Sequence, residues 1–148
     1  MSLASVQNFS ITIGSSEEAV RDGLTALRRH LGLVSVGEET AASVELGVAE
    51  ALNNVVEHAY GAGKSGPIVI EARADDMAID VTLTDEGTPL PQHKLPPAHL
   101  PETDVALDDM PEGGFGWFLI RQLAFAVRYT RFDKYNRLEL QFMNPIDG

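Results

Sequence analysis

The 148 residues of this chain are enough for one domain with a buried core, and 44% of them are hydrophobic, as in an ordinary globular protein. The 22 Asp and Glu residues outnumber the 11 Lys and Arg residues, and the resulting charge of −11 repels the phosphate backbone of nucleic acids. The absence of cysteine excludes disulfides and thiolate metal sites, and the absence of a signal peptide or of an apolar run long enough to span a membrane predicts a cytoplasmic protein.

The first third of the chain predicts one strand and two helices. Residues 9–13 alternate between apolar and polar side chains, which is typical of a strand. A capping-box sequence at residues 15–18 and a stop signal at Gly32 predict a helix over about 16–31. A second start signal at residues 35–38 predicts a helix that runs to about Tyr60.

The middle of the chain predicts two strands and a long irregular segment. Residues 61–67 have the composition of a loop, and a strand begins at Ile68. Alternation over Met77–Leu83 predicts a second strand with one wet face. Residues 88–112 contain most of the chain's eight prolines and show little periodicity. Such a long loop in a compact domain is usually functional or disordered.

The last part of the chain predicts a helix over about 115–126 and strands over about 126–132 and 137–143. No internal repeat is visible. The order of elements predicts a single α+β domain over residues 1–148, with an antiparallel-leaning sheet and helices on one face.

Three polar residues recur at helical spacing in the second helix. At about 100° per residue, Glu50, Asn54 and His58 lie along one flank of the apolar face. A carboxylate there can take a proton, and an Asn carbonyl oxygen suits Mg²⁺. The alternative is that these residues form a solvated border of the helix, which is how we interpret Glu57. In that case His58 packs or forms hydrogen bonds near the helix end. The predicted buried face consists of Ala41, Val44, Val48, Ala51, Leu52, Val55 and Ala59.

A second motif, Asp85-Glu86-Gly87, follows directly on a predicted strand. An Asp at a strand end can accept a hydrogen bond from an exocyclic amine, and a glycine allows the backbone to approach a flat ring closely. The alternative is an ordinary turn, which Asp-x-Gly sequences often form.

A third motif, Gly113-Gly114-Phe115-Gly116, opens the third predicted helix. Glycines at a helix N-terminus expose N–H groups and the positive end of the helix dipole to phosphate. The alternative is a flexible junction between loop and helix. The spacing matches neither the P-loop nor a convincing dinucleotide fingerprint.

The order of these motifs resembles the GHKL (Bergerat-fold) ATP-binding domains, and within them the bacterial anti-sigma-factor serine/threonine kinases. The Glu-x-x-x-Asn-x-x-x-His motif of that family is matched at residues 50–58, its Asp-x-Gly-x-Pro motif at residues 85–89 and its Gly-Gly-x-Gly-x-x-Leu-Ile box at residues 113–120. The resemblance spans almost the whole chain. It implies a two-layer α+β sandwich with a mostly antiparallel sheet of about five strands, three helices on one face and an ATP lid at about residues 88–112.

The resemblance also implies ATP and Mg²⁺ as cofactors and assigns a role to each motif. Glu50 would be the catalytic base, Asn54 the Mg²⁺ ligand and Asp85 the adenine anchor, with Asn136 as a looser match near the adenine. Gly87 would line the base pocket. The implied nucleotide-binding set is Asn54, His58, Asp85, Gly87, Gly114 and Gly116.

The implied reaction transfers the ATP γ-phosphate to a Ser or Thr of a STAS-type anti-anti-sigma protein. The same chain would bind a sigma factor and could form a homodimer, with no nucleic acid or membrane as direct partner. Arg21, Arg28 and Arg29 form the densest positive cluster, which is either a solvated helix face or a docking site for acidic partner residues.

One departure from the family pattern supports a different class of function. Relatives often carry an Arg just before the glycine box, whereas this chain reads Met110-Pro111-Glu112, and Lys94 is the only Lys or Arg within residues 88–112. The alternative is therefore a nucleotide-switched protein-binding module with little or no kinase activity. A histidine-kinase catalytic fragment fits less well, because the chain has no dimerisation helices with a phospho-acceptor His.

Overall fold

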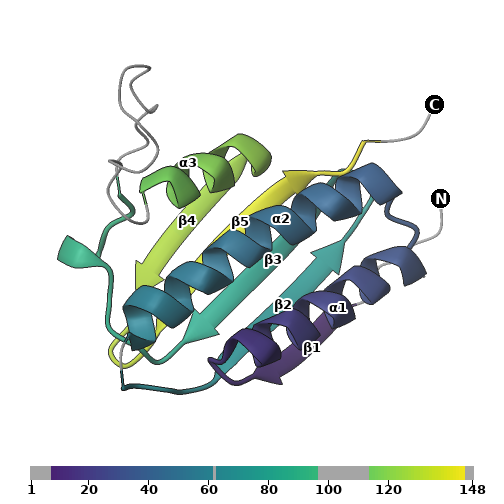
Figure 1. The fold of residues 1–148 in the computed structure, drawn as a ribbon. Coiled ribbons are helices and arrows are strands. Elements are labelled where there is room, and N and C mark those ends of the chain that lie inside the picture. Colours follow the sequence, from purple (N-terminus) through teal and green to yellow (C-terminus); the bar gives the residue numbers. More distant parts are fainter. Residues whose placement is uncertain (1–7, 62, 97–113, 146–148) are drawn as a thin grey trace.

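The computed structural model describes residues 8–61, 63–96 and 114–145. Within them, five strands form one antiparallel sheet in the order β1-β2-β3-β5-β4 (Figure 1). The strands are β1 (Asn8–Ile13), β2 (Ile68–Ala74), β3 (Ala78–Asp85), β4 (Ala126–Arg131) and β5 (Asn136–Met143). Because β3 pairs with β5, the end of β3 meets the start of β5, and Asp85 lies opposite Asn136.

The helices of the described chain lie together on one face of this sheet, with α2 between α1 and α3 (Figure 1). They are α1 (Glu17–Leu33), α2 (Glu38–Asn54) and α3 (Gly114–Leu123). Burying apolar area between the two layers is the main favourable term in folding. The fully buried side chains between the layers include Leu27 and Leu31 of α1, Val44 and Val48 of α2, Ile120 of α3, and Ile70, Leu83 and Leu140 of the sheet. The predicted two-layer α+β fold is confirmed.

The first helix is capped one residue later than the sequence predicts. Ser16 is the N-cap, and its Oγ accepts a hydrogen bond from the N–H of Ala19 at 3.0 Å. A capping box needs Glu or Gln three residues after the N-cap, and Ala19 occupies that place. The predicted stop at Gly32 is also wrong, because the helix continues to Leu33 and the left-handed residue after it is Ser35, with φ of 66°.

The helical segment does run to Tyr60, as predicted for the second helix, but its N-cap and its regularity differ from the prediction. Ser35 does not cap it, because the N-cap is Gly37, which makes no side-chain cap hydrogen bond. The α-helix ends at Asn54, and Val55–Tyr60 form a π-helical turn. A π turn holds more residues than an α turn, so a regular helical projection no longer applies beyond Asn54. The predicted buried face is confirmed, with only Ala59 partly exposed.

The predicted starts of β2 at Ile68 and of β4 at Ala126 are confirmed, whereas several other boundaries shift by one to three residues. Met77 lies before β3 and is 75% exposed, because the Asp75 carboxylate accepts the N–H groups of Met77 and Ala78 at 2.8 and 2.9 Å and forms a turn there. The third helix ends at Leu123, earlier than predicted. β5 begins at Asn136, one residue earlier than predicted, which places this side chain in the sheet.

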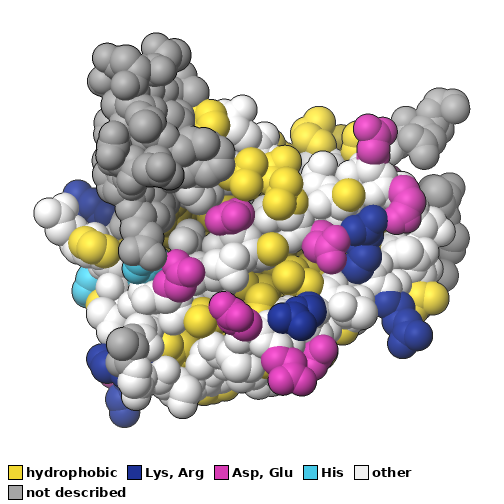
Figure 2. All heavy atoms as spheres, viewed as in Figure 1, with side chains coloured by type: hydrophobic (Ala, Val, Ile, Leu, Met, Phe, Trp, Pro, Cys, Tyr) yellow, Lys and Arg dark blue, Asp and Glu magenta, His cyan; other side chains and the backbone are white. Residues whose placement is uncertain are grey.

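The first two helices are joined by a charged contact. Arg28 of α1 donates hydrogen bonds to Glu38 and Glu45 of α2 at 2.7 and 2.5 Å. Figure 2 views this helix face, on which Lys and Arg side chains gather over α1 and acidic side chains are spread along α2. Of the predicted positive cluster, Arg28 is thus engaged within the fold, whereas Arg21 and Arg29 are exposed. None of the described helices combines the length and apolar character of a membrane span.

Candidate functional site

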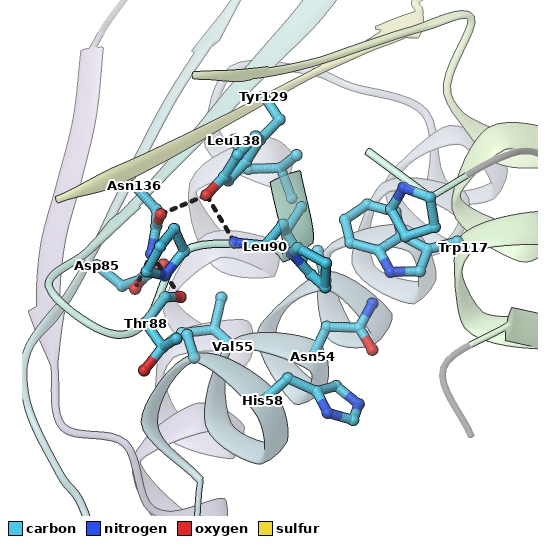
Figure 3. A pocket seen from close by; sticks show the side chains of 15 residues that line it. Asn54, Val55, His58, Asp85, Thr88, Leu90, Trp117, Tyr129, Asn136 and Leu138 are labelled. Atoms are coloured by element: carbon cyan, nitrogen blue, oxygen red, sulfur yellow. Dashed lines mark hydrogen bonds between the residues drawn. The ribbon is translucent and has the colours of Figure 1, made fainter. Parts of the chain in front are cut away.

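A cavity of about 510 Å³ lies where β3 ends and β5 begins (Figure 3). Its walls are largely apolar, and Val55, Leu90, Trp117 and Leu138 are among the residues that line it. In Figure 3, polar side chains enter from opposite sides, with Asp85 and Asn136 on the sheet side and Asn54 and His58 on the helix side. Apolar walls with a few converging polar groups are typical of a small-molecule site.

Asp85 is a buried carboxylate at the sheet side of the cavity. It is 4% exposed, and its Oδ1 accepts the N–H of Gly87 at 2.8 Å and the Nδ2–H of Asn136 at 2.9 Å. Burial raises the pKa of Asp85, while these two hydrogen bonds and the nearby Arg131 act in the opposite direction. Both hydrogen bonds end on Oδ1, so Oδ2 carries neither. Asp85 lines the cavity, and a carboxylate oxygen at a largely apolar wall favours a ligand that offers a donor.

Asn136 connects Asp85 to the backbone that follows it. Its Nδ2 also lies 3.3 Å from the carbonyl oxygen of Gly87 and 3.2 Å from that of Thr88. Because Asn136 is itself buried, these contacts hold the turn after β3 in one position relative to β5. The sequence suggested Asn136 as a loose match only, and the pairing of β3 with β5 makes it the direct partner of Asp85.

Two residues of β4 complete this network, and the sequence did not identify either as part of a site. Tyr129 Oη donates to Asn136 Oδ1 and accepts the N–H of Leu90 at 3.0 Å. Arg131 Nη1 donates to the carbonyl oxygen of Gly87 at 2.8 Å and to Asn136 Oδ1 at 3.2 Å. Side chains alternate along a strand, so Tyr129 and Arg131 lie on the same face of β4 as Val127. This alternation could have indicated both residues from the sequence.

Gly87 is required by close packing on the helix side of the molecule. A Cβ atom at this position would lie 2.5 Å from the carbonyl oxygen of Ala59 in the π turn. The same oxygen accepts the N–H of Thr88 at 2.7 Å. Gly87 was predicted to line a pocket for the adenine base, but it is not among the residues that line the cavity.

We expect Gly87→Ala to lower the free energy of unfolding by about 1–3 kcal/mol, because the added methyl group would collide with backbone that cannot move without disturbing the π turn. The matched control is Gly14→Ala, since no heavy atom lies within 4 Å of a Cβ there. Urea unfolding of both variants measures the difference. Equal stabilities of the two variants would show that the contact with Ala59 relaxes freely.

The first and third sequence motifs meet on the other side of the cavity. A Cβ on Gly116 would lie 3.0 Å from Oε2 of Glu50 and 3.8 Å from Oδ1 of Asn54. The first turn of α3 therefore rests directly on these two polar residues of α2. Gly114 is the first residue of α3, whereas Gly113 and residues 97–112 of the predicted lid lie outside the described residues.

Asn54 and His58 differ in their surroundings. The Asn54 Nδ2 atom is buried and has no hydrogen-bond partner among the described residues. The His58 side chain is 43% exposed, with Nε2 4.0 Å from the Glu57 carboxylate. Both line the cavity, whereas Glu50 lies beside it. Within the described part of the chain, no three His, Asp or Glu side chains are grouped to hold a metal ion.

Trp117 is a further residue that sequence reasoning did not assign to the site. It is the chain's single tryptophan, is 6% exposed and lines the cavity from α3, next to Gly116. Figure 3 shows its ring on the side of the cavity away from Asp85. Its position within the glycine-rich motif at residues 113–120 could have indicated from the sequence that it belongs to the site.

Comparison with known proteins identifies related sequences and a related fold. The histidine kinase-like ATPase domain family matches residues 13–142. The serine/threonine-protein kinase BtrW of Bordetella bronchiseptica is 33% identical over 91 residues, 62% of each chain. The serine-protein kinase RsbW of Oceanobacillus iheyensis is 35% identical over 89 residues, 57% of this chain and 54% of that protein. The chain therefore matches less than two thirds of the length of these curated relatives.

A crystal structure of the RsbU and RsbW domains of a Mycobacterium tuberculosis protein has a TM-score of 0.65 to this chain, at 19% identity. The match covers 94% of this chain and 33% of that one, and at this identity it shows the fold alone. The family match covers all the described helices and the strands from β2 to β5 apart from the last residue of β5, and it includes only the last residue of β1. The chain belongs to the histidine kinase-like ATPase domain family.

Proposed function

We propose that this protein is an ATP- and Mg²⁺-dependent serine/threonine kinase that acts on an anti-anti-sigma protein in a bacterial partner-switching pathway. The observation that carries the proposal is the packing of Gly116 against Glu50 and Asn54, beside a cavity that ends at a buried carboxylate. Relatives named serine and serine/threonine protein kinases support the reaction class.

The adenine of ATP fits the sheet side of the cavity. Oδ2 of Asp85 is an acceptor for the exocyclic amine, and the apolar walls suit a flat ring. This orientation directs the phosphates towards the α2–α3 contact, where the N-terminal turn of α3 offers N–H groups and the positive end of its dipole. Gly114 and Gly116 are the proposed phosphate-binding positions there.

Asn54 fits the role of Mg²⁺ ligand. Its amide is buried at the cavity wall, and Nδ2 makes no hydrogen bond to a described residue, so the group is free to turn its oxygen towards a cation. Mg²⁺ usually takes one or two protein ligands and fills its remaining positions with phosphates and water. When bound, it would neutralise charge on the transferred phosphoryl group.

Glu50 is the proposed base. It is half-buried, one helical turn before Asn54 and in contact with the start of α3, so its carboxylate lies beside the proposed phosphate position. There it can accept the proton of an attacking Ser or Thr hydroxyl. His58, at the exposed edge of the cavity, completes the proposed nucleotide-binding set.

The proposal extends to the whole chain and its partners. Residues 1–148 would form a single cytoplasmic domain that phosphorylates a STAS-type antagonist and binds a sigma factor. The family resemblance also implies a homodimer. The second candidate is a nucleotide-switched binding module without transfer activity. It is favoured by the scarcity of cations, since Lys94 is exposed and is the only Lys or Arg of residues 88–112.

We expect ATP to change Trp117 fluorescence in a Mg²⁺-dependent manner, and Asn54→Ala to abolish the dependence on Mg²⁺. Trp117 reports the site directly, because no other tryptophan exists in the chain. Asn53→Ala is the matched control, since Asn53 is exposed and does not line the cavity. Absence of any ATP response by fluorescence and by calorimetry would refute the proposed nucleotide site.

The two candidate functions separate in a second measurement. The protein with Mg²⁺ and ATP is incubated with each STAS-type protein of its own organism, and products are analysed by intact mass spectrometry. A phosphorylated Ser or Thr identifies a kinase. Nucleotide binding that changes partner affinity without any phosphorylated product identifies a switched binding module.

A further inference from the structure

One wall of the cavity is a segment held near its start by hydrogen bonds of Thr88 and Leu90 and at its end by a hydrogen bond of Pro96. We call residues 88–96 the strap. Near its start, the N–H of Leu90 donates to Tyr129 Oη at 3.0 Å. At its end, the carbonyl oxygen of Pro96 accepts a hydrogen bond from Arg121 Nη2 at 3.1 Å. The strap supplies several lining residues, including Leu90 and Pro96, so both attachments fix a wall of the proposed nucleotide pocket.

Between these points the backbone of the strap is strained. Gln92 has φ of 59° and ψ of 14°, and His93 has φ of 57°, so two successive non-glycine residues are left-handed. Such conformations cost free energy and persist only where surrounding contacts determine them. Leu90 and Leu95 pack against the core on either side of this turn. The hydrogen bonds at the two ends of the strap therefore hold a backbone conformation that is unfavourable by itself.

The surroundings of Arg121 indicate more than a packing role. It lies on α3 one helical turn after Trp117, and its Nε is buried without a hydrogen-bond partner among the described residues. Burying an unpaired donor is unfavourable, so an apolar side chain of similar size would fill this place at lower cost. The guanidinium instead supplies a charged hydrogen-bond donor to the Pro96 carbonyl of the strap. The same helix rests on Glu50 and Asn54 through Gly116, so Arg121 connects the strap to the proposed phosphate side.

We propose that Arg121 is a positioning residue that holds the strap on α3 through the Pro96 carbonyl and thereby sets how long a nucleotide stays in the cavity. The inference rests on the proposed function, because it takes the ligand to be ATP. A ligand in the cavity keeps its contacts with this wall only while the strap stays in place. Weakening its attachment at Pro96 makes it easier for this wall to move away and raises the dissociation rate, with little effect on the encounter that governs the association rate.

The test is stopped-flow displacement of mant-ATP by excess ATP, followed by energy transfer from Trp117. For Arg121→Gln we expect the dissociation rate to rise about tenfold, the effect of losing one hydrogen bond from a charged donor. The association rate should stay within about twofold of wild type. Arg121→Lys, which keeps a charged donor, should restore much of the slow dissociation. Arg128→Gln is the matched control, because Arg128 is exposed on β4 and its carboxylate partner, Glu139, lies 3.9 Å away outside the cavity.

Hydrogen exchange distinguishes positioning from a general loss of stability. Without nucleotide, Arg121→Gln should speed amide exchange in the peptide covering residues 88–96 and leave β2 and β3 unchanged. A wild-type protein that binds no mant-ATP would defeat the proposed function and this inference together. Normal binding with an unchanged dissociation rate in Arg121→Gln would overturn the inference alone. Faster exchange throughout the sheet, with no rescue by Arg121→Lys, would also overturn it in favour of a structural role.

Discussion

Asp85→Asn is expected to weaken ATP binding by about 10- to 150-fold, the range for a hydrogen bond to a buried charged acceptor. The substitution is nearly isosteric. An amide oxygen in place of Oδ1 can still accept the N–H of Gly87 and the amide of Asn136, so the turn after β3 should persist. At the other position the variant presents an NH₂ donor to the cavity. The adenine amine then meets a donor instead of an acceptor, which explains the expected loss.

The same inversion predicts a change of preference. Inosine triphosphate carries a carbonyl oxygen where ATP carries the amine, so Asp85→Asn should bind it better relative to ATP than wild type does. Calorimetric titration of both nucleotides measures this ratio, with the exposed Asp133→Asn as control. Because burial raises the pKa of Asp85, wild-type ATP affinity should begin to fall on acidification at a higher pH than for an ordinary Asp, and the variant should lack this dependence. An unchanged ratio of the two affinities would show that the adenine ring does not bind at Asp85.

Glu50→Gln is expected to reduce phosphate transfer by about 10²–10⁴-fold while ATP binding changes little. The amide has the size of the carboxylate, so its contact with Gly116 and the start of α3 is retained. Only the ability to accept a proton is lost. The measurement is single-turnover transfer from γ-labelled ATP to the STAS-type acceptor, or to water where no acceptor has been identified.

The matched control for this prediction is Glu57→Gln. Glu57 lies two helical turns further along, its side chain is 55% exposed, and it does not line the cavity. We expect this control to retain wild-type transfer. Full activity of Glu50→Gln would remove Glu50 as the base, even if ATP binding were intact. A parallel loss of binding and transfer would instead assign Glu50 to holding the nucleotide.

The local errors of sequence interpretation have a common cause. Ser35 has the side chain of a helix cap, but the path between α1 and α2 gives it a left-handed backbone, and Gly37 becomes the N-cap. Likewise, the projection that aligned Asn54 with His58 assumes a regular α-helix, whereas the chain changes to a π turn after Asn54. Propensity and spacing are weak compared with the requirements of packing and of joining successive elements.

The layers of the fold and the buried face of α2 could be predicted from the sequence, because alternation and helical spacing of apolar residues are properties of neighbouring residues. The sequence also indicated the three motifs of the candidate site, whose proposed roles remain predictions. Tertiary structure alone decided which of them meet. The pairing of β3 with β5 places Asn136 on Asp85, and the approach of α3 to α2 places Gly116 on Glu50. It also revealed Tyr129 and Arg121 as attachments of the strap. These contacts join residues far apart in the chain, and they depend on distances of a few ångströms that no local pattern encodes.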